Sequence, residues 1–285
     1  MDDNIINLAV KEILSNNIEE MIKKETFFKE YFRVFYNNKI FNEDTIKSIS
    51  ENIKLDTVNE LSEKLIKIFK DKLNILSNLH IENQIGLILF IGDGKIDGHS
   101  IIINNYVYVF IDLKALISRS NYNYDLDSFI SHEIIHAIHY KLNKAFYNKD
   151  YSIMKDIYLK TLIIEGMATY MTMRIFKTSE RLGYWLGLMN LEEIEEWKNN
   201  CKKLKLNIGK RLNKTIANKK FDKDLYDKLF CIKKGEKLTL YRTGYYYGAE
   251  IIKNICIDMS INEIFNINLE SIMDYINSYF DRNIF

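Results

Sequence analysis

The chain of 285 residues contains no proline, although average usage of about 5% would place about 14 in a chain of this length. Proline-rich linkers and polyproline ligands are therefore excluded. Cysteine is also scarce, because only Cys201, Cys231 and Cys256 occur, widely spaced and without a Cys-x-x-Cys pair. An odd number of dispersed cysteines predicts free thiols in a reducing compartment rather than a disulfide framework.

Neither sign of charge dominates, and no long apolar run is present. Lys and Arg together number 40 against 39 Asp and Glu, which gives a net charge of +1 and no basic excess for nucleic-acid binding. No stretch approaches the roughly 18 uncharged apolar residues of a membrane span. The N-terminal sequence MDDNIINLAVKEILSNN has acids where a signal peptide needs bases. We therefore expect a cytoplasmic protein with no nucleic-acid partner, although export without a signal peptide leaves no trace in a sequence.

The spacing of apolar residues predicts helices at the N-terminus, followed by one β region. Residues 1–80 read as helices, most clearly from Asp56 to His80, where apolar residues recur every three or four positions. Residues 84–113 contain short apolar, β-rich runs, two of which meet at Asn104-Asn105 and predict a β-hairpin.

The remainder of the chain reads as helical from about Tyr124 onward. Asp125 or Asp127 can cap a helix that runs to about Asn143, and a second strong helix is expected over Ser152–Lys177. Further helices follow to the end of the chain. Strands followed by helices, without β/α alternation, predict a mostly helical α+β protein.

The segment SHEIIHAIHY, residues 131–140, carries the clearest chemical signal. His132 and His136 lie one turn apart on the same face of a helix, where two neutral imidazoles can bind one Zn²⁺. Glu133 is displaced by one residue and can take a proton from a water bound to that ion, which makes this an HExxH motif. The rest of the helix is apolar, and burial of an unpaired polar group costs roughly 2–7 kcal/mol. A polar His-Glu-His face on such a helix therefore indicates a function.

A catalytic zinc site needs three protein ligands and one open position. We expect Glu165, in TLIIEGMATYMT, to be the third ligand, because a metal bond would offset the burial of a lone carboxylate in an apolar helix. Gly166 and Ala168 are small and would let this helix approach the HExxH helix closely. One straight helix cannot converge three side chains on one ion, so we expect His139 to be a hydrogen-bonded residue that packs in the wall of the site or supports a zinc ligand.

HEIIH, followed after about thirty residues by EGMATY, resembles the gluzincin class of zinc metallopeptidases. With RTGYYYGAEIIK at residues 242–253, the chain is similar to bacterial predicted zinc-dependent proteases with HExxH, EGxA and GYxxG-like motifs. The resemblance spans residues 84–260 and implies a zincin-like fold with one Zn²⁺, a small antiparallel β region before the HExxH helix and a helical C-terminal lobe. We therefore expect an N-terminal helical region over 1–80 and a catalytic domain over 81–285, which can also form one continuous domain.

The resemblance also implies a hydrogen-bond donor for the oxyanion, supplied by the C-terminal lobe. Tyr245 and Tyr246 are the candidates, and Tyr247 is expected in the aromatic core. We expect Arg242 at the surface, with binding of a substrate carboxylate as its alternative role. We expect His99 in an exposed turn, with lining of the cleft as the alternative.

The expected function is that of a zinc metallopeptidase acting on a peptide or protein substrate. His132, His136 and Glu165 hold Zn²⁺, while Glu133 takes a proton from water and returns it to the leaving amine. A strand within 99–112 would pair with the extended peptide. Three alternatives stay open: a zinc hydrolase of a non-peptide amide or ester, a non-enzymatic zinc-binding module, and a secreted-type effector or toxin protease. The sequence predicts neither the substrate's identity, nor endo- against exo-cleavage, nor the oligomeric state.

Overall fold

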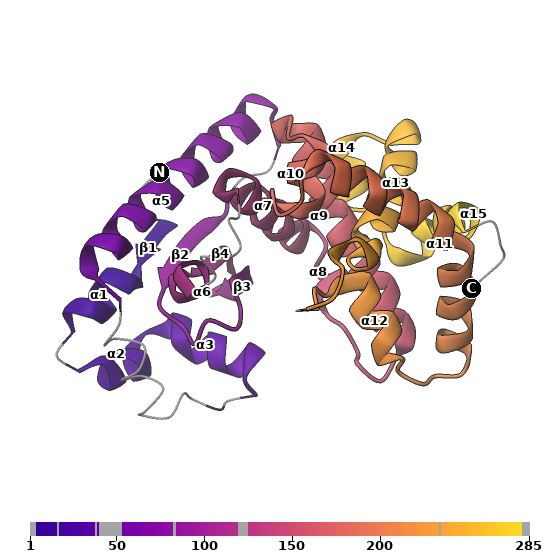
Figure 1. Cartoon of the computed structure of the whole chain (residues 1–285). Helices are drawn as coiled ribbons and strands as arrows, with labels where there is room; N and C mark the ends of the chain where they lie inside the picture. The colour runs from indigo at the N-terminus through magenta and orange to yellow at the C-terminus, as the bar shows by residue number, and fades with distance from the viewer. Residues whose placement is uncertain are drawn as a thin grey trace. The chain divides into compact units, whose positions relative to one another are not determined.

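The computed structural model describes residues 4–280 apart from residues 16, 38, 40–52, 82–83, 119–124 and 234. The chain divides into two compact units, Met1–Ala137 and Ile138–Phe285 (Figure 1). Helices around one small sheet make this a mostly helical α+β protein, which confirms the predicted fold class. The predicted division into residues 1–80 and 81–285 stays a prediction.

The first unit contains the whole described sheet. Its elements are β1 (Ile5–Asn7), α1 (Leu8–Leu14), α2 (Ile18–Lys24), α3 (Thr26–Phe35), α5 (Leu55–Asn78), β2 (Gly86–Phe90), β3 (Gly98–Ile103), β4 (Tyr106–Asp112), α6 (Leu113–Ser118) and most of α7 (Leu126–Leu142). The strand order is β1-β2-β4-β3, with β1 parallel to β2, β2 parallel to β4, and β3 antiparallel to β4.

The predicted hairpin is confirmed, but the sheet around it is mixed rather than antiparallel. Asn104 and Asn105 join β3 to β4 with φ angles of 50° and 65°, the left-handed pair that a two-residue hairpin turn requires and that asparagine tolerates. The antiparallel region was implied by the family resemblance and holds only for this hairpin, whereas the parallel pairs bring together strands that are separated along the chain. Strand β1, at three residues, is too short to show alternation and lies where helix alone was expected.

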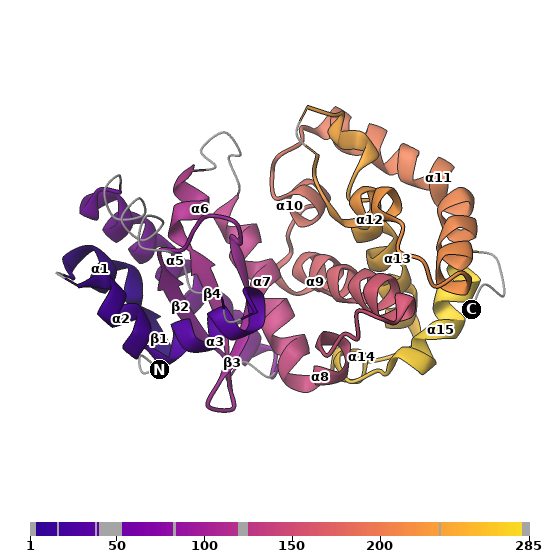
Figure 2. The same cartoon turned by 90° about the horizontal axis from the view of Figure 1, so that it is seen from below.

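Aromatic side chains of α3 form the core on one face of the sheet. Phe27 and Tyr31 pack on Phe90 of β2 and Phe110 of β4, with the Tyr31 and Phe90 ring centroids 5.0 Å apart. Helix α5 lies on the opposite side of the sheet from α3, as the two views show (Figures 1 and 2). The sheet is therefore covered on both faces, which explains why all five residues of β2 are buried.

Helix α7 follows the sheet and carries the HExxH sequence. Asp125 caps it, because its Oδ1 accepts the backbone N–H of Ser128 at 2.8 Å. The ammonium of Lys72 on α5 donates to Asp127 Oδ1 at 2.6 Å and ties the first turn down. Every residue from Ser128 to His139 is buried, so the predicted apolar helix is confirmed.

The second unit is helical in the part that the structure describes. After the end of α7 it contains α8 (Lys144–Tyr147), a π-helical turn η2 (Asp156–Lys160), α9 (Thr161–Phe176), α10 (Glu180–Trp185), α11 (Leu191–Ala217), α12 (Lys223–Phe230), the 3₁₀ turn η3 (Leu238–Leu240), α13 (Thr243–Asp258), α14 (Ile261–Phe265) and α15 (Leu269–Tyr279). Helices α9 and α13 run side by side at its centre (Figure 1). Gly166 of α9 meets Gly248 of α13 there, so its small size serves a contact that the sequence analysis does not predict.

Two further expectations concern thiols and membranes. Cys201, Cys231 and Cys256 are all free thiols, as predicted. Among the described residues, no helix combines the length and the apolar character needed to cross a membrane.

Candidate metal centre

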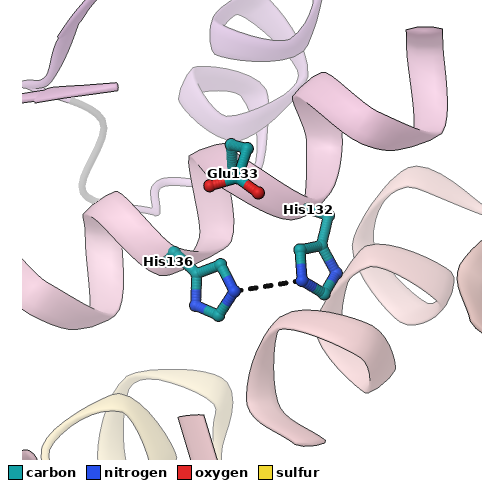
Figure 3. Close-up of side chains that lie close together, drawn as sticks. All are labelled: His132, Glu133 and His136. Carbon is teal, nitrogen blue, oxygen red and sulfur yellow. Dashed lines mark hydrogen bonds between the residues drawn. The ribbon is translucent and has the colours of Figure 1, made fainter. Parts of the chain in front are cut away.

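His132, Glu133 and His136 lie together on α7. The two imidazoles project from the same side of the helix and their Nε2 atoms are 3.0 Å apart (Figure 3). Their ring planes meet at 83°, with centroids 4.6 Å apart. Glu133 stands on the turn between them, and each of the three residues offers a ligand atom within 4.8 Å of the others. This is the arrangement that the four-residue spacing predicts.

The donor set fits a zinc ion. Zinc binds imidazole nitrogen at about 2.0–2.1 Å with tetrahedral angles, which places two such nitrogens about 3.3 Å apart. The observed 3.0 Å between the Nε2 atoms is close to that separation. Two neutral imidazoles facing each other can share only one proton between them, whereas a cation accepts a lone pair from both. His132 and His136 each keep 6% of their surface exposed, so the pair is buried but not sealed.

A glycine outside the motif makes room for Glu133. Gly98 begins β3, and a β-carbon there would lie 2.9 Å from Phe129 Cζ and 3.4 Å from Glu133 Cγ. Because Gly98 has no side chain, α7 can approach the first residue of the strand, and Glu133 lies at this contact. Sequence analysis did not single out Gly98, although a glycine at a strand end is a signal of close backbone approach.

Glu165 lies in the second unit on α9. It is partly exposed, whereas its neighbours Ile164 and Gly166 are buried. Burial lowers the pKa of the Lys149 ammonium, and the negative charge of Glu165 acts in the opposite direction. It also adds to the rise in the pKa of Tyr226 to about 12, which burial mainly causes. The assignment of Glu165 as the third zinc ligand stays a prediction.

The three consecutive tyrosines of α13 have different surroundings. Tyr247 is fully buried and its hydroxyl donates to the Cys201 carbonyl at 2.9 Å, which is the core role expected of it. The ring of Tyr246 packs on Tyr184 and Trp197, and burial raises its pKa to about 12. Tyr245 is partly exposed. The catalytic roles of Tyr245 and Tyr246 stay predictions.

Two residues do not lie where the sequence analysis expects them. Arg242 keeps only 7% of its surface exposed, so the expectation of a surface arginine is wrong. Its guanidinium packs against the ring of Trp185, which belongs to α10, and against the ring of Tyr245 in the first turn of α13. His99 lies within β3 rather than in an exposed turn, because its ring packs against Phe35 of α3 and Phe110 of β4.

His139 packs in an aromatic cluster, which is one of the two roles expected of it. It is fully buried, and its ring lies against the rings of Phe146, Tyr147 and Phe265. Its Nδ1 is 3.4 Å from the Tyr147 hydroxyl. These contacts account for its burial without a metal bond.

A buried helix with two converging imidazoles and an adjacent glutamate defines a protein with an HExxH-type metal site in a mostly helical α+β fold. Residues 55–274 match the family described as predicted Zn-dependent protease (DUF2268), and the chain belongs to this family. The matched region contains the HExxH residues, Glu165 and the tyrosines of α13. Comparison with curated proteins gives no match, and comparison with solved structures gives none either.

Proposed function

We propose that this protein is a gluzincin-type zinc peptidase in which His132, His136 and Glu165 hold one Zn²⁺ and Glu133 is the general base. The observation that carries the proposal is the 3.0 Å approach of two buried Nε2 atoms on α7, with Glu133 on the turn between them. Membership of a family described as predicted Zn-dependent proteases supports it. Glu165 is the candidate for the third ligand because it is the acid of the EGMATY motif.

The protein's own residues account for the movement of the proton. Zinc, when bound, supplies Lewis acidity that lowers the pKa of water and polarises a carbonyl group. The Glu133 carboxylate accepts the proton of the attacking water at Oε and returns it to the leaving amine. Gly98 lies beside the Glu133 side chain, because a β-carbon there would come within 3.4 Å of Glu133 Cγ.

Strand β3 is the proposed docking site for the peptide. It is the outer strand of the described sheet, next to β4 on one side only. The free edge of a strand can pair with an extended peptide through main-chain hydrogen bonds. Because Gly98 at the start of β3 lies against Glu133, a peptide on this edge runs past the proposed general base.

Tyr245 is the better candidate for the oxyanion donor. It lies three residues before Gly248, so both occupy the same face of α13, and Gly248 contacts Gly166, the residue after Glu165. Tyr246 points instead into the cluster with Tyr184 and Trp197. The hydroxyl of Tyr245 would donate a hydrogen bond to the oxygen that becomes negative during attack.

The test is Glu133→Gln, with Glu60→Gln on the exposed face of α5 as its control. The amide keeps the shape of the side chain but cannot accept a proton, so we expect kcat to fall by about 10²–10⁴-fold with one zinc still bound. The readouts are zinc content by elemental analysis and cleavage sites mapped over a proteome-derived peptide mixture. Full activity in Glu133→Gln would overturn the mechanism. Hydrolysis that depends on Glu133 but is confined to small amides or esters would favour a non-peptide substrate.

A further inference from the structure

Arg242 is a buried cation for which the described residues supply no anionic partner. The residue is 7% exposed, and within the described part of the chain no carboxylate pairs with its guanidinium. Burying a charge without a counter-ion or full hydrogen bonding is costly. By contrast, Arg211 in the same unit lies nearer the surface and pairs with both Asp222 and Asp224. The arrangement at Arg242 therefore needs an explanation other than an internal salt bridge.

The guanidinium is held in place by two aromatic rings. Its central carbon lies 3.8 Å from the centroid of Tyr245 and 5.3 Å from that of Trp185. Attraction between a cation and a ring face offsets part of the desolvation of the buried guanidinium. The rings orient the planar group but supply no hydrogen-bond acceptor in its plane.

The backbone at Arg242 is also fixed in an unusual conformation. Arg242 has φ 53°, in the left-handed region that arginine rarely adopts. Its neighbours are anchored, because Trp197 Nε1 donates to the Tyr241 carbonyl at 2.8 Å and the Thr243 hydroxyl donates to the Lys228 carbonyl at 3.3 Å. Strain that is maintained by its surroundings in this way is concentrated at binding and catalytic sites.

Two buried hydrogen-bond donors at this place lack an acceptor in the described part of the chain. Among the described residues, neither Arg242 Nε nor Trp185 Nε1 has a hydrogen-bond acceptor, and both atoms are buried. Arg242 is also the N-cap residue of the 16-residue helix α13, and its guanidinium lies over the ring of Tyr245, which belongs to the first turn of that helix. The N-terminus of a helix carries partial positive charge and favours anions.

We propose that Arg242 and the first turn of α13 form a binding site for a carboxylate group of a peptide. A carboxylate matches the planar, two-pronged donor edge of arginine and supplies the missing acceptors. The carboxylate reaches the guanidinium through the small surface that the residue keeps exposed. This inference rests on the proposed peptidase function only in taking a peptide as the ligand.

The test measures binding to the full chain and needs no cleavage. The probes are N-acetyl-glycylglycine, its C-terminal amide, and N-acetyl-aspartic acid amide, which carries its carboxylate on a side chain. Affinity is measured by titration calorimetry, and the melting temperature is followed with and without each probe. The variants are Arg242→Gln and Arg242→Lys, with Arg211→Gln as the control arginine because it is already paired.

For the wild-type protein and Arg211→Gln we expect both carboxylate probes to raise the melting temperature and to bind at least tenfold more tightly than the amide. We expect Arg242→Gln to lose that preference and Arg242→Lys to keep only part of it, because lysine retains the charge without the planar edge. Tighter binding of N-acetyl-glycylglycine would identify the ligand as a chain terminus. Tighter binding of N-acetyl-aspartic acid amide would identify it as an acidic side chain.

Equal affinity for the carboxylates and the amide would overturn the proposal, as would unchanged carboxylate binding by Arg242→Gln. Arg242→Lys guards against loss of folding in the glutamine variant. The outcome is separable from that of the peptidase proposal. A chain that prefers carboxylates but cleaves no peptide retains this site and loses the function, whereas cleavage without that preference retains the function and loses the site.

Discussion

Gly166 of α9 and Gly248 of α13 lie in backbone contact. A β-carbon on Gly248 would come within 2.8 Å of Gly166 Cα, and one on Gly166 would come within 2.6 Å of the Gly248 carbonyl oxygen. Two motifs that are distant in sequence, EGMATY and GYYYG, therefore meet at a single helix crossing. The crossing fixes the position of Glu165 on one helix relative to Tyr245 on the other, which explains why each motif contains a glycine.

We expect Gly248→Ala to destabilise the protein by about 1–3 kcal/mol or more, the usual cost of overpacking, because its β-carbon would overlap the carbonyl oxygen of Leu162. Gly209→Ala in α11 is the control. Its nearest neighbours would be side-chain atoms of the buried Phe280, 3.0 Å away at Cδ1 and 3.2 Å at Cβ, rather than a backbone carbonyl, and alanine favours a helix over glycine, so we expect a smaller loss of stability than in Gly248→Ala. Urea denaturation measures both. Equal stability of the two variants would contradict the tight crossing.

We expect Glu165→Ala to lose zinc together with activity. If it removes one of three ligands, zinc affinity should fall by more than the 10–100-fold that loss of a supporting hydrogen bond typically costs. Zinc competition with a chromogenic chelator measures this. The control is Glu250→Ala, a partly exposed acid on α13 that lies 3.5 Å from Lys253. Wild-type affinity in Glu165→Ala, together with zinc loss in His139→Ala, would assign the third ligand to His139.

We expect Tyr245→Phe to lower kcat and kcat/KM together by about 10²–10³-fold, with KM nearly unchanged and zinc retained. A hydroxyl that donates only to the developing oxyanion contributes little to binding of the ground state. The ring, and its contact with Arg242, survives the change. Tyr247→Phe is the control, because its hydroxyl already donates to the Cys201 carbonyl. Steady-state kinetics on one cleaved peptide decides, and a change in KM alone would contradict the role.

The sequence predicts those parts of the fold that depend on residues close together along the chain. The hairpin depends on Asn104-Asn105 and its flanking strands, and the HExxH cluster depends on one turn of α7. Strand β1 was missed because three residues carry no periodicity and its partner β2 lies far along the chain. A parallel pairing of this kind is set by packing, which a local pattern does not contain.

The environment of single residues was harder to predict. Arginine is usually exposed, so only the positions of Trp185 and Tyr245 reveal that Arg242 is buried. The need for glycine at position 98 likewise becomes clear only from the Glu133 side chain, which the fold brings next to it. Residue type gave the chemistry of the HExxH motif, whereas these contacts required the tertiary structure.

Two buried acids in the first unit make stability depend on pH. Glu12 of α1 is 3% exposed, and its Oε1 accepts the Ile91 N–H at 3.0 Å. Burial raises the pKa of Glu12 well above its usual value, and the nearby Asp112 carboxylate adds to the rise. Burial also raises the pKa of Asp112 to about 6, against the lowering effect of the N–H groups of Gly92, Gly94 and Lys114.

Because the folded pKa of Glu12 exceeds its unfolded value of about 4.3, the folded state binds more protons. The free energy of unfolding should therefore fall as pH rises from about 4.3 through the folded pKa, with Asp112 adding to the loss up to about pH 6. Glu12→Gln keeps an acceptor for the Ile91 N–H but carries no charge. At pH 8 we expect this variant to be more stable than the wild-type protein, by about 1.4 kcal/mol for each unit by which folding raises the pKa of Glu12, counted up to pH 8. Near pH 5 we expect this advantage to be lost. Urea denaturation between pH 5 and pH 8 measures the difference, with Glu60→Gln expected to follow the wild-type curve. Parallel curves for Glu12→Gln and the wild-type protein would show that Glu12 is already ionised in the folded state.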